Sequence, residues 1–196
     1  CVLRAYEHWR GITPEGHRRA RDCLEGAVEL DPEYAEAWAW LGPLYRQEYA
    51  HEFNPRPDLY DPLDRALEAA QRAVDLDPTS QAAHHALADA YFFRHELGPF
   101  FVEAEKAVAL NPNNSDVLSS LGLRMATAGE WDSTVRARVG KGAKGLQMVR
   151  KAMALNPYHP GWYYFPLATD HYLKGEYEEA LTQMQKINMP EFYWTQ

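Results

Sequence analysis

The chain has 196 residues and a formal charge of −8, from 20 basic and 28 acidic side chains. This length allows one domain with a sizeable core or two small ones, and the acidic balance argues against direct binding of nucleic acid. Two cysteines cannot supply a disulfide framework or a four-cysteine zinc site, and no apolar run is long enough to span a membrane. We expect a cytoplasmic globular protein, and the first residue, Cys1, indicates a fragment of a longer chain.

Apolar residues at helical spacing predict ten helices along the chain. In order, their expected ranges are 2–11, 14–30, 34–47, 62–76, 80–95, 99–110, 114–128, 142–155, 161–174 and 176–188. Two starts are marked by a capping side chain followed by proline, at Thr13-Pro14 and Asp61-Pro62. Pro166 falls inside the ninth range, and we expect it to kink that helix or to set its start.

One phrase recurs four times, a leucine followed by aspartate or asparagine and then proline. The prolines are Pro32, Pro78, Pro112 and Pro157, so their spacings are 46, 34 and 45, which are 34 with insertions of 12 and 11. The residue before proline is driven out of the α region, which ends one helix, and proline is tolerated in the first turn of the next. The phrase therefore marks a 34-residue period made of helix, turn and helix.

Within the second period, Trp38, Leu41, Gly42 and Tyr45 share one helix face, and small residues such as Ala66 recur in the second helix. This pattern resembles the tetratricopeptide repeat (TPR). The resemblance implies an all-α fold, a right-handed superhelix of antiparallel helix pairs in a single domain over 1–196. The units would be about 1–32, 33–78 with an insertion at 47–61, 79–112, 113–157 with an insertion at 129–144, 158–190, and the start of another helix at 191–196.

The same register implies a concave groove lined by the first helix of each pair. The candidate partner-binding residues there are Arg46, His85, Asp89, Phe92, Trp162, Phe165 and Tyr172. Exposed aromatic side chains favour an apolar or extended peptide, because they offer a large contact area at a low entropic cost. The alternative is that Phe92, Phe165 and Tyr172 pack between neighbouring helices. The lysine and asparagine with which TPR domains hold chaperone carboxylates are absent from these positions.

The second insertion and the helix after it are basic, since residues 133–169 hold six basic side chains and no acidic one. A docking segment for an acidic surface is expected at Arg136, Arg138, Lys141 and Lys144. The glycines and lysines here do not have the P-loop spacing. We expect no metal site, because adjacent residues such as His84 and His85 face different ways on a helix and cannot easily bind one ion. We expect no catalytic residue either, because Cys23 lies in a helix without a catalytic partner. No cofactor is expected.

These features predict a non-catalytic module that binds a protein or peptide, within a larger signalling or regulatory protein. Phrases such as Thr13-Pro14-Glu15-Gly16 resemble the TPR region that follows the catalytic domain of bacterial class III adenylate cyclase-like proteins, or the winged-helix domain of related regulators. Two alternatives stay open. One is a small-ligand-sensing regulatory domain of a cyclase-like enzyme, and the other is a homo-oligomerisation element at the C-terminal end, where Phe192, Tyr193 and Trp194 gather.

Overall fold

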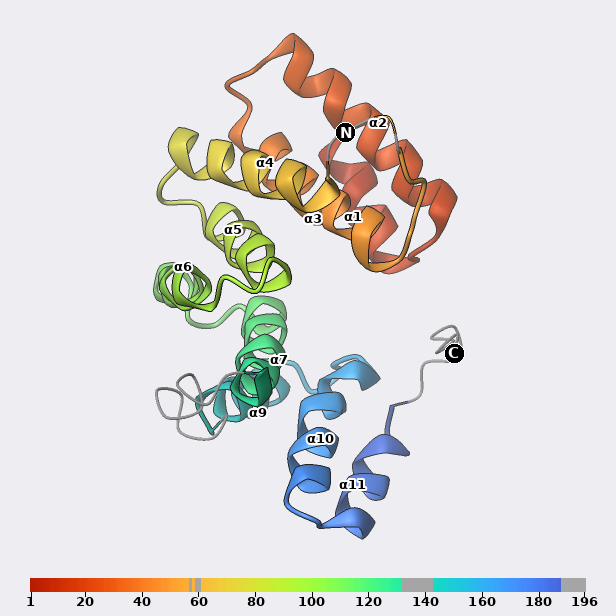
Figure 1. Ribbon diagram of the computed structural model, residues 1–196, viewed down its shortest axis with the longest axis vertical. Coiled ribbons are helices and arrows are strands. Elements are labelled where there is room, and N and C mark those ends of the chain that lie inside the picture. The colour runs from red at the N-terminus through yellow and green to blue at the C-terminus, as the bar shows by residue number, and fades with distance from the viewer. Residues whose placement is uncertain (57, 59–60, 132–142, 188–196) are drawn as a thin grey trace. The chain divides into compact units, whose positions relative to one another are not determined.

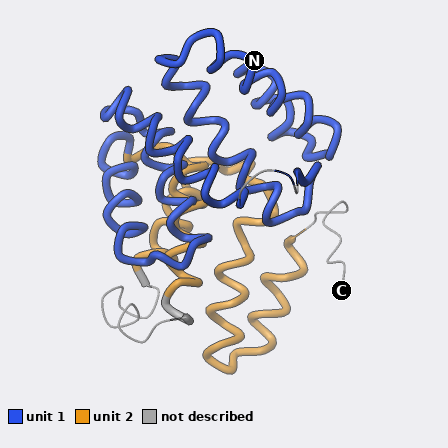
Figure 2. Tube along the Cα trace, turned by 45° about the horizontal axis from the view of Figure 1, so that its top comes forward, with its two compact units in different colours: residues 1–111 blue, residues 112–196 orange. Residues whose placement is uncertain are grey.

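The computed structural model describes the chain except at residues 57, 59–60, 132–142 and 188–196, and every regular element in the described part is a helix (Figure 1). The chain divides into two compact units, Cys1–Asn111 and Pro112–Gln196 (Figure 2). Each unit is described below by itself. Among the described helices, none is both long and apolar enough to cross a membrane.

Unit 1, Cys1–Asn111, consists of three helix pairs. Its helices are α1 (Val2–Arg10), α2 (Pro14–Leu30), α3 (Ala35–Ala50), α4 (Pro62–Leu76), α5 (Gln81–Phe93) and α6 (Leu97–Leu110). Within each pair the second helix folds back on the first, and α3 also contacts α2, α4 and α5 (Figure 1). Each pair therefore buries its apolar face against the next pair as well as within itself.

Unit 2, Pro112–Gln196, contains two further pairs. Its elements are α7 (Ser115–Trp131), α9 (Ala143–Leu155), the 3₁₀ helix η1 (Gly161–Tyr164), α10 (Phe165–Leu173) and α11 (Tyr177–Met184). Helix α7 packs on α9, and α10 packs on α11. The described helices thus follow the predicted order closely, although α11 ends at Met184 rather than at residue 188.

The helix starts that the capping residues predict are confirmed. The Thr13 hydroxyl accepts a hydrogen bond from the Gly16 amide at 3.1 Å, and the Asp61 carboxylate accepts one from the Leu63 amide at 2.7 Å. In both helices proline follows the cap. Pro166 lies in the first turn of α10, directly after η1, so it sets the start of that helix as expected.

The first insertion begins later than the sequence indicates. The repeat pattern places an insertion at 47–61, but α3 continues to Ala50 and buries both Gln47 and Glu48. Residues Gln47 and Glu48 stay within the helix because the side chain of each has a buried partner on another helix. The sequence pattern does not show these partners. The second insertion is also shortened, since α7 extends to Trp131, and residues 132–142 lie outside the described part of the chain.

Glycine permits a close contact between two helices of unit 2. A Cβ atom added to Gly122 would lie 2.7 Å from the carbonyl oxygen of Gly145, and one added to Gly145 would lie 2.5 Å from the carbonyl oxygen of Gly122. No other residue fits where two backbones approach so closely. This confirms that small residues at the repeat positions let the paired helices α7 and α9 come together.

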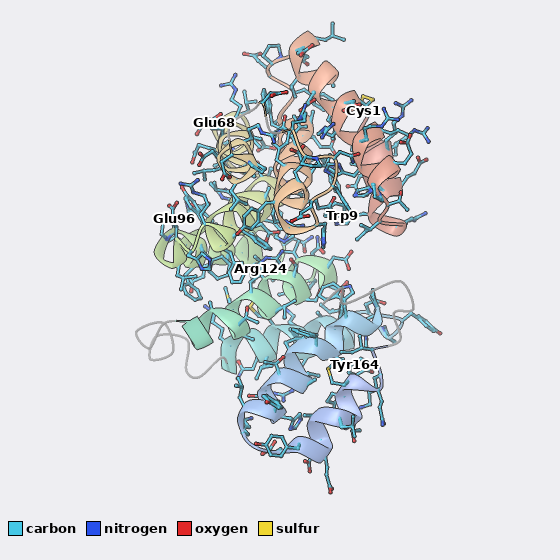
Figure 3. The ribbon with its side chains drawn as sticks, turned by 45° about the vertical axis from the view of Figure 1, so that its right-hand side comes forward. Cys1, Trp9, Glu68, Glu96, Arg124 and Tyr164 are labelled. Carbon is cyan, nitrogen blue, oxygen red and sulfur yellow. A yellow bond between two sulfur atoms is a disulfide. The ribbon has the colours of Figure 1, made fainter. Side chains whose placement is uncertain are left out.

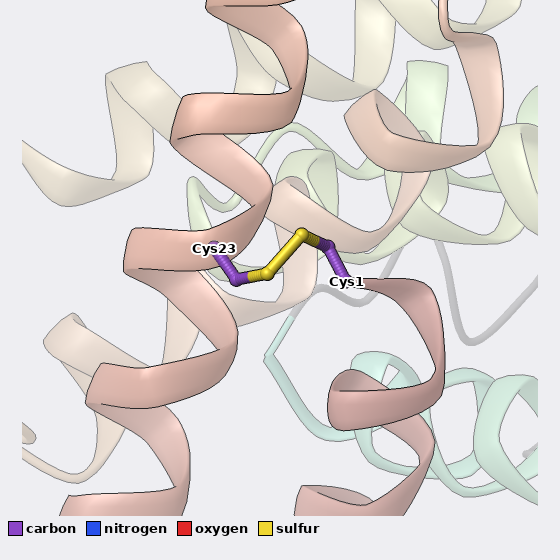
Figure 4. Close-up of a disulfide and its surroundings, with 2 residues drawn as sticks. All are labelled: Cys1 and Cys23. Atoms are coloured by element: carbon purple, nitrogen blue, oxygen red, sulfur yellow. A yellow bond between two sulfur atoms is a disulfide. The ribbon is translucent and has the colours of Figure 1, made fainter.

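A disulfide joins Cys1, the N-cap of α1, to Cys23 in the middle of α2 (Figure 4). The Sγ atoms of the two cysteines are 2.03 Å apart, and the Cα atoms are 5.3 Å apart. The sequence interpretation treated Cys23 as an ordinary helix residue and missed this pairing. The fold brings the two cysteines together because α1 packs back along α2.

Candidate functional site

Three of the predicted groove residues meet in unit 1. Asp89 on α5 lies between two cationic or titratable side chains, with its carboxylate 3.8 Å from Nε of Arg46 and 3.7 Å from Nε2 of His85. The Arg46 guanidinium also stands over the ring of Phe93, 5.0 Å from its centroid. We call Arg46, His85, Asp89 and Phe93 the α3–α5 cluster.

The α3–α5 cluster is only partly open to solvent. Arg46 is 9% exposed and Asp89 5%, whereas His85 and Phe93 are half-buried. The buried pair fixes the positions of the charges, because a buried carboxylate is costly unless a cation stands beside it. His85 and Phe93 are therefore the members of the cluster that are open to solvent in part, while Arg46 and Asp89 are buried.

Phe92 requires a correction. It was a candidate groove residue, with packing between neighbouring helices as the alternative, and its burial agrees with the alternative. Phe92 is 6% exposed, and its ring packs against those of Phe100 and Phe93 with centroids 5.3 and 5.5 Å away. The adjacent Phe93 is the residue that carries an accessible ring beside Arg46. Successive residues of a helix face different directions. The ring of Phe92 is therefore buried while that of its neighbour Phe93 is accessible.

The other predicted groove residues belong to unit 2. Trp162 in η1 is half-buried and meets the ring of Tyr163 at 4.5 Å, and Phe165 at the start of α10 is also half-buried. Tyr172 is 62% exposed and meets Tyr177 of α11 at 5.6 Å. Their grouping with the α3–α5 cluster into one groove stays a prediction.

A buried ionic cluster supports α3 from the side of α2 and α4. The Glu48 carboxylate, 1% exposed, accepts hydrogen bonds from Arg21 at 2.9 Å and Arg65 at 2.5 Å. Arg56, from the first insertion, lies 3.4 Å from Glu48 and 2.5 Å from Glu25. These ion pairs join α3 to α2 and α4 and fasten the insertion to unit 1. Nothing in the repeat pattern pointed to them.

Two buried histidines lie between α1, α2 and α3. His8 donates from Nε2 to the Gln47 amide oxygen at 2.7 Å, and His17 donates from Nε2 to the Leu44 carbonyl at 2.9 Å. The amide of Asn54 donates to Nδ1 of His17 at 3.1 Å. Burial lowers the pKa of both histidines below its ordinary value, because a charged ring loses its hydration, and the hydrogen bonds to Gln47 and Leu44 oppose this only in part.

Aromatic rings from α1 and α3 lie together at the surface of unit 1. The ring of Trp40 meets Tyr6 at 4.6 Å and Trp9 at 5.9 Å, both edge to face. Tyr6 and Trp9 are exposed, and Cys1 and Trp9 mark the two ends of α1 (Figure 3). The sequence interpretation overlooked this aromatic surface, although Trp9 has the inner-face register of the first repeat. We call Tyr6, Trp9 and Trp40 the α1–α3 aromatic surface.

Most of the predicted basic docking segment lies outside the described part of the chain. Arg136, Arg138 and Lys141 lie outside the described residues, and Lys144 is exposed in the first turn of α9. Among the described side chains, no group of three or more His, Cys, Asp or Glu residues is placed to hold a metal ion.

Stacked antiparallel helix pairs, with small residues at contacts such as Gly122–Gly145 and Gly42–Ala70, are the architecture of a TPR-like all-helical fold. Solved structures agree. TTC0263, a thermophilic TPR protein in Thermus thermophilus, has a TM-score of 0.64 and 21% identity, covering 95% of this chain and 87% of that one. MamA has a TM-score of 0.56 and 22% identity over 88% and 87% of the two chains. At such identities the likeness shows the fold alone, and the all-α, TPR-like fold class is confirmed.

A third structure and one sequence relative complete the comparisons. YrrB, a TPR protein with an unusual peptide-binding site, has a TM-score of 0.54 and 17% identity, covering 88% of this chain and 77% of that one. The cell division cycle protein 27 homolog of Caenorhabditis elegans is 29% identical over 105 residues, which are 54% of this chain and 12% of that protein. The chain thus spans a small part of that relative's length. No protein-family model matches the chain.

Proposed function

We propose that the chain is a non-catalytic interaction module that binds an extended segment of a partner protein at the α3–α5 cluster. Support comes from the TPR-like fold and from the description of YrrB, with the same fold, as having a peptide-binding site. The chain would work as a scaffold within a larger signalling or regulatory protein. The link to cyclase-like proteins stays a prediction.

The meeting of Arg46, His85 and Asp89 beside Phe93 is the observation that carries this proposal. An accessible aromatic ring gives a peptide an apolar contact, while fixed charges next to it orient polar backbone or side-chain groups. The arrangement fits a segment that places an apolar side chain on Phe93 and a hydrogen-bond acceptor near His85.

Selection from an immobilised library of random peptides, followed by calorimetry on the selected sequences, tests the proposal. The double variant His85→Ala, Phe93→Ala should weaken binding of those peptides by about tenfold or more, in the range that loss of a central aromatic contact causes. Tyr158→Ala is the matched control, because Tyr158 is an exposed ring in unit 2. Equal binding by the double variant and the wild type would remove the α3–α5 cluster from the proposal.

Homo-oligomerisation is a second candidate, favoured by an apolar stripe on α11. Tyr177, Leu181 and Met184 follow one another at helical spacing and are all exposed, while Ala180 alone of that helix is buried. Corresponding second-helix positions in unit 1, such as Leu24 of α2, are buried in the core. The α11 stripe therefore has the character of a surface that another helix covers.

Light scattering of the chain in solution tests this second candidate. A dimer that becomes monomeric in the variant Tyr177→Glu, Leu181→Glu supports it, because two carboxylates cannot be buried without partners. Glu178→Gln, on the same helix but off the stripe, is the control. A wild-type chain that is monomeric over the accessible concentration range excludes it.

A further inference from the structure

Few contacts other than the Cys1–Cys23 disulfide hold helix α1 in place. Of its nine residues only Ala5 and His8 are buried, and Leu3, Tyr6 and Trp9 are exposed. Few side chains of the described helix are therefore held in place by burial. Its position on α2 and α3 depends on a short set of contacts. These are the packing of Val2 and Ala5 on the core cluster, the hydrogen bond from His8 to Gln47, the ring contacts with Trp40, and the Cys1–Cys23 bond.

The disulfide is open to attack from solvent. Cys1 is exposed and Cys23 is half-buried on α2, so the bond lies at the surface of unit 1, within reach of a thiolate in solution. Exchange requires such an approach to one sulfur, and exposed disulfides are the ones that exchange with thiols in solution. The same bond buried beneath a helix pair would be protected.

We propose that the Cys1–Cys23 disulfide is a thiol–disulfide exchange site for dithiols, and that its redox state sets whether α1 stays docked. A thiolate of the dithiol attacks Sγ of Cys1, the sulfur–sulfur bond breaks, and Cys23 leaves as a thiolate that takes up a proton. The second thiol of the dithiol then attacks the mixed disulfide and releases Cys1. Two cysteine thiols are formed, and the dithiol becomes a disulfide, so two electrons pass from the reductant to this site.

Reduction would change the surface of unit 1 where α1 lies against α2 and α3. Once the covalent bond is lost, α1 opens more often and takes Tyr6 and Trp9 away from Trp40, so the α1–α3 aromatic surface is complete in a smaller fraction of the reduced molecules than of the oxidised ones. Opening also uncovers buried core residues of α2, Ala20 and Leu24, which form one cluster with Ala5. In a compartment that dithiol proteins keep reducing, the fraction of molecules with α1 open would increase. In an oxidising compartment, most molecules would have α1 docked.

Hydrogen exchange followed by mass spectrometry tests the proposal on residues 1–196, with dithiothreitol as the dithiol. The untreated protein should contain no free thiol, and the treated protein should contain two. Treatment should raise the exchange of amides in α1 by about tenfold or more, in line with the stabilisation that a disulfide gives, while α5 and α11, which hold no cysteine, keep their rates. In the variant Cys1→Ser, Cys23→Ser, the α1 amides should exchange as fast as in the reduced protein, and dithiothreitol should not change their rates.

Three outcomes would overturn the proposal: two free thiols in protein purified in air, unchanged exchange of α1 after both thiols are released, or an equal rise in all helices. If the serine variant fails to fold, reduction of the folded wild type still decides the question, because the same molecules are compared before and after treatment. Peptide binding is not measured in this experiment, so its result is independent of the proposed binding function.

Discussion

At the scale of single residues, the glycines show where a side chain has no room. Gly122→Ala should destabilise unit 2, by about 1–3 kcal/mol as for other overpacked sites, because the new Cβ would meet the Gly145 carbonyl oxygen 2.7 Å away. Gly26→Ala is the matched change on α2, where nothing lies within 4 Å. It should stabilise the protein by about 0.4–1 kcal/mol. Urea unfolding of both variants measures the contrast, and a similar effect at the two sites would contradict it.

The buried carboxylate of Glu48 makes a second residue-scale prediction. Glu48→Gln keeps the shape of the side chain but leaves Arg21 and Arg65 without their shared charge. Breaking a buried pair by removing one partner costs about 3–5 kcal/mol, and we expect a loss in that range by urea unfolding. Glu15→Gln should change the free energy of unfolding by less than about 1 kcal/mol, because Glu15 pairs with Arg18 at the surface. A small loss at Glu48 would show that the cluster is solvated.

The buried histidines predict a pH dependence of known sign. The pKa values of His8 and His17 are lowered from 6.5, chiefly by burial, so below that pH the unfolded chain binds more protons than the folded one. Their contribution to stability is therefore complete above about pH 6.5 and is lost as the pH falls. Unfolding free energies measured from about pH 7.5 to 5.5 should decrease, and less steeply in His8→Gln. A flat profile would be inconsistent with neutral buried rings.

At the scale of elements, the caps are the features that a single substitution can test. Thr13→Ala removes the hydroxyl that accepts the Gly16 amide at the start of α2. The expected loss of stability is about 1 kcal/mol. Thr182→Ala removes a hydroxyl that bonds within α11, at the Glu178 carbonyl, and should be close to neutral because alanine favours a helix interior. Thermal unfolding of the two variants compares a cap with a helix interior.

Elements were the features that sequence predicted best, and their ends show why. Thr13-Pro14 and Asp61-Pro62 start helices through local chemistry, a cap followed by a fixed φ, which the chain carries whatever its surroundings. The end of α3 depends instead on partners. Gln47 and Glu48 continue the helix because His8 and Arg21 meet them from helices distant in the sequence. The same limit explains why the pairing of Cys23 was missed.

At the scale of the whole molecule, the two compact units predict two separable responses to core damage. Leu41→Ala removes a fully buried side chain from unit 1, and Met125→Ala removes one from unit 2. Each should cost about 2–5 kcal/mol, and the loss of amide protection should be largest within the unit that carries the change. Hydrogen exchange resolved by helix measures this. Equal loss of protection in α3 and α7 for both variants would show that the units unfold together.

The sequence by itself determined the repeat, the order of the helices and the small residues at their contacts, because these follow from periodicity and from proline and glycine chemistry in nearby residues. It also brought Arg46, His85 and Asp89 into consideration through the repeat register. Only the tertiary structure decided that Phe93 rather than Phe92 is accessible, since one helical step separates a buried ring from a half-buried one. The same holds for the Glu48 cluster and the disulfide, whose partners are distant in the chain and meet only after the helices have packed.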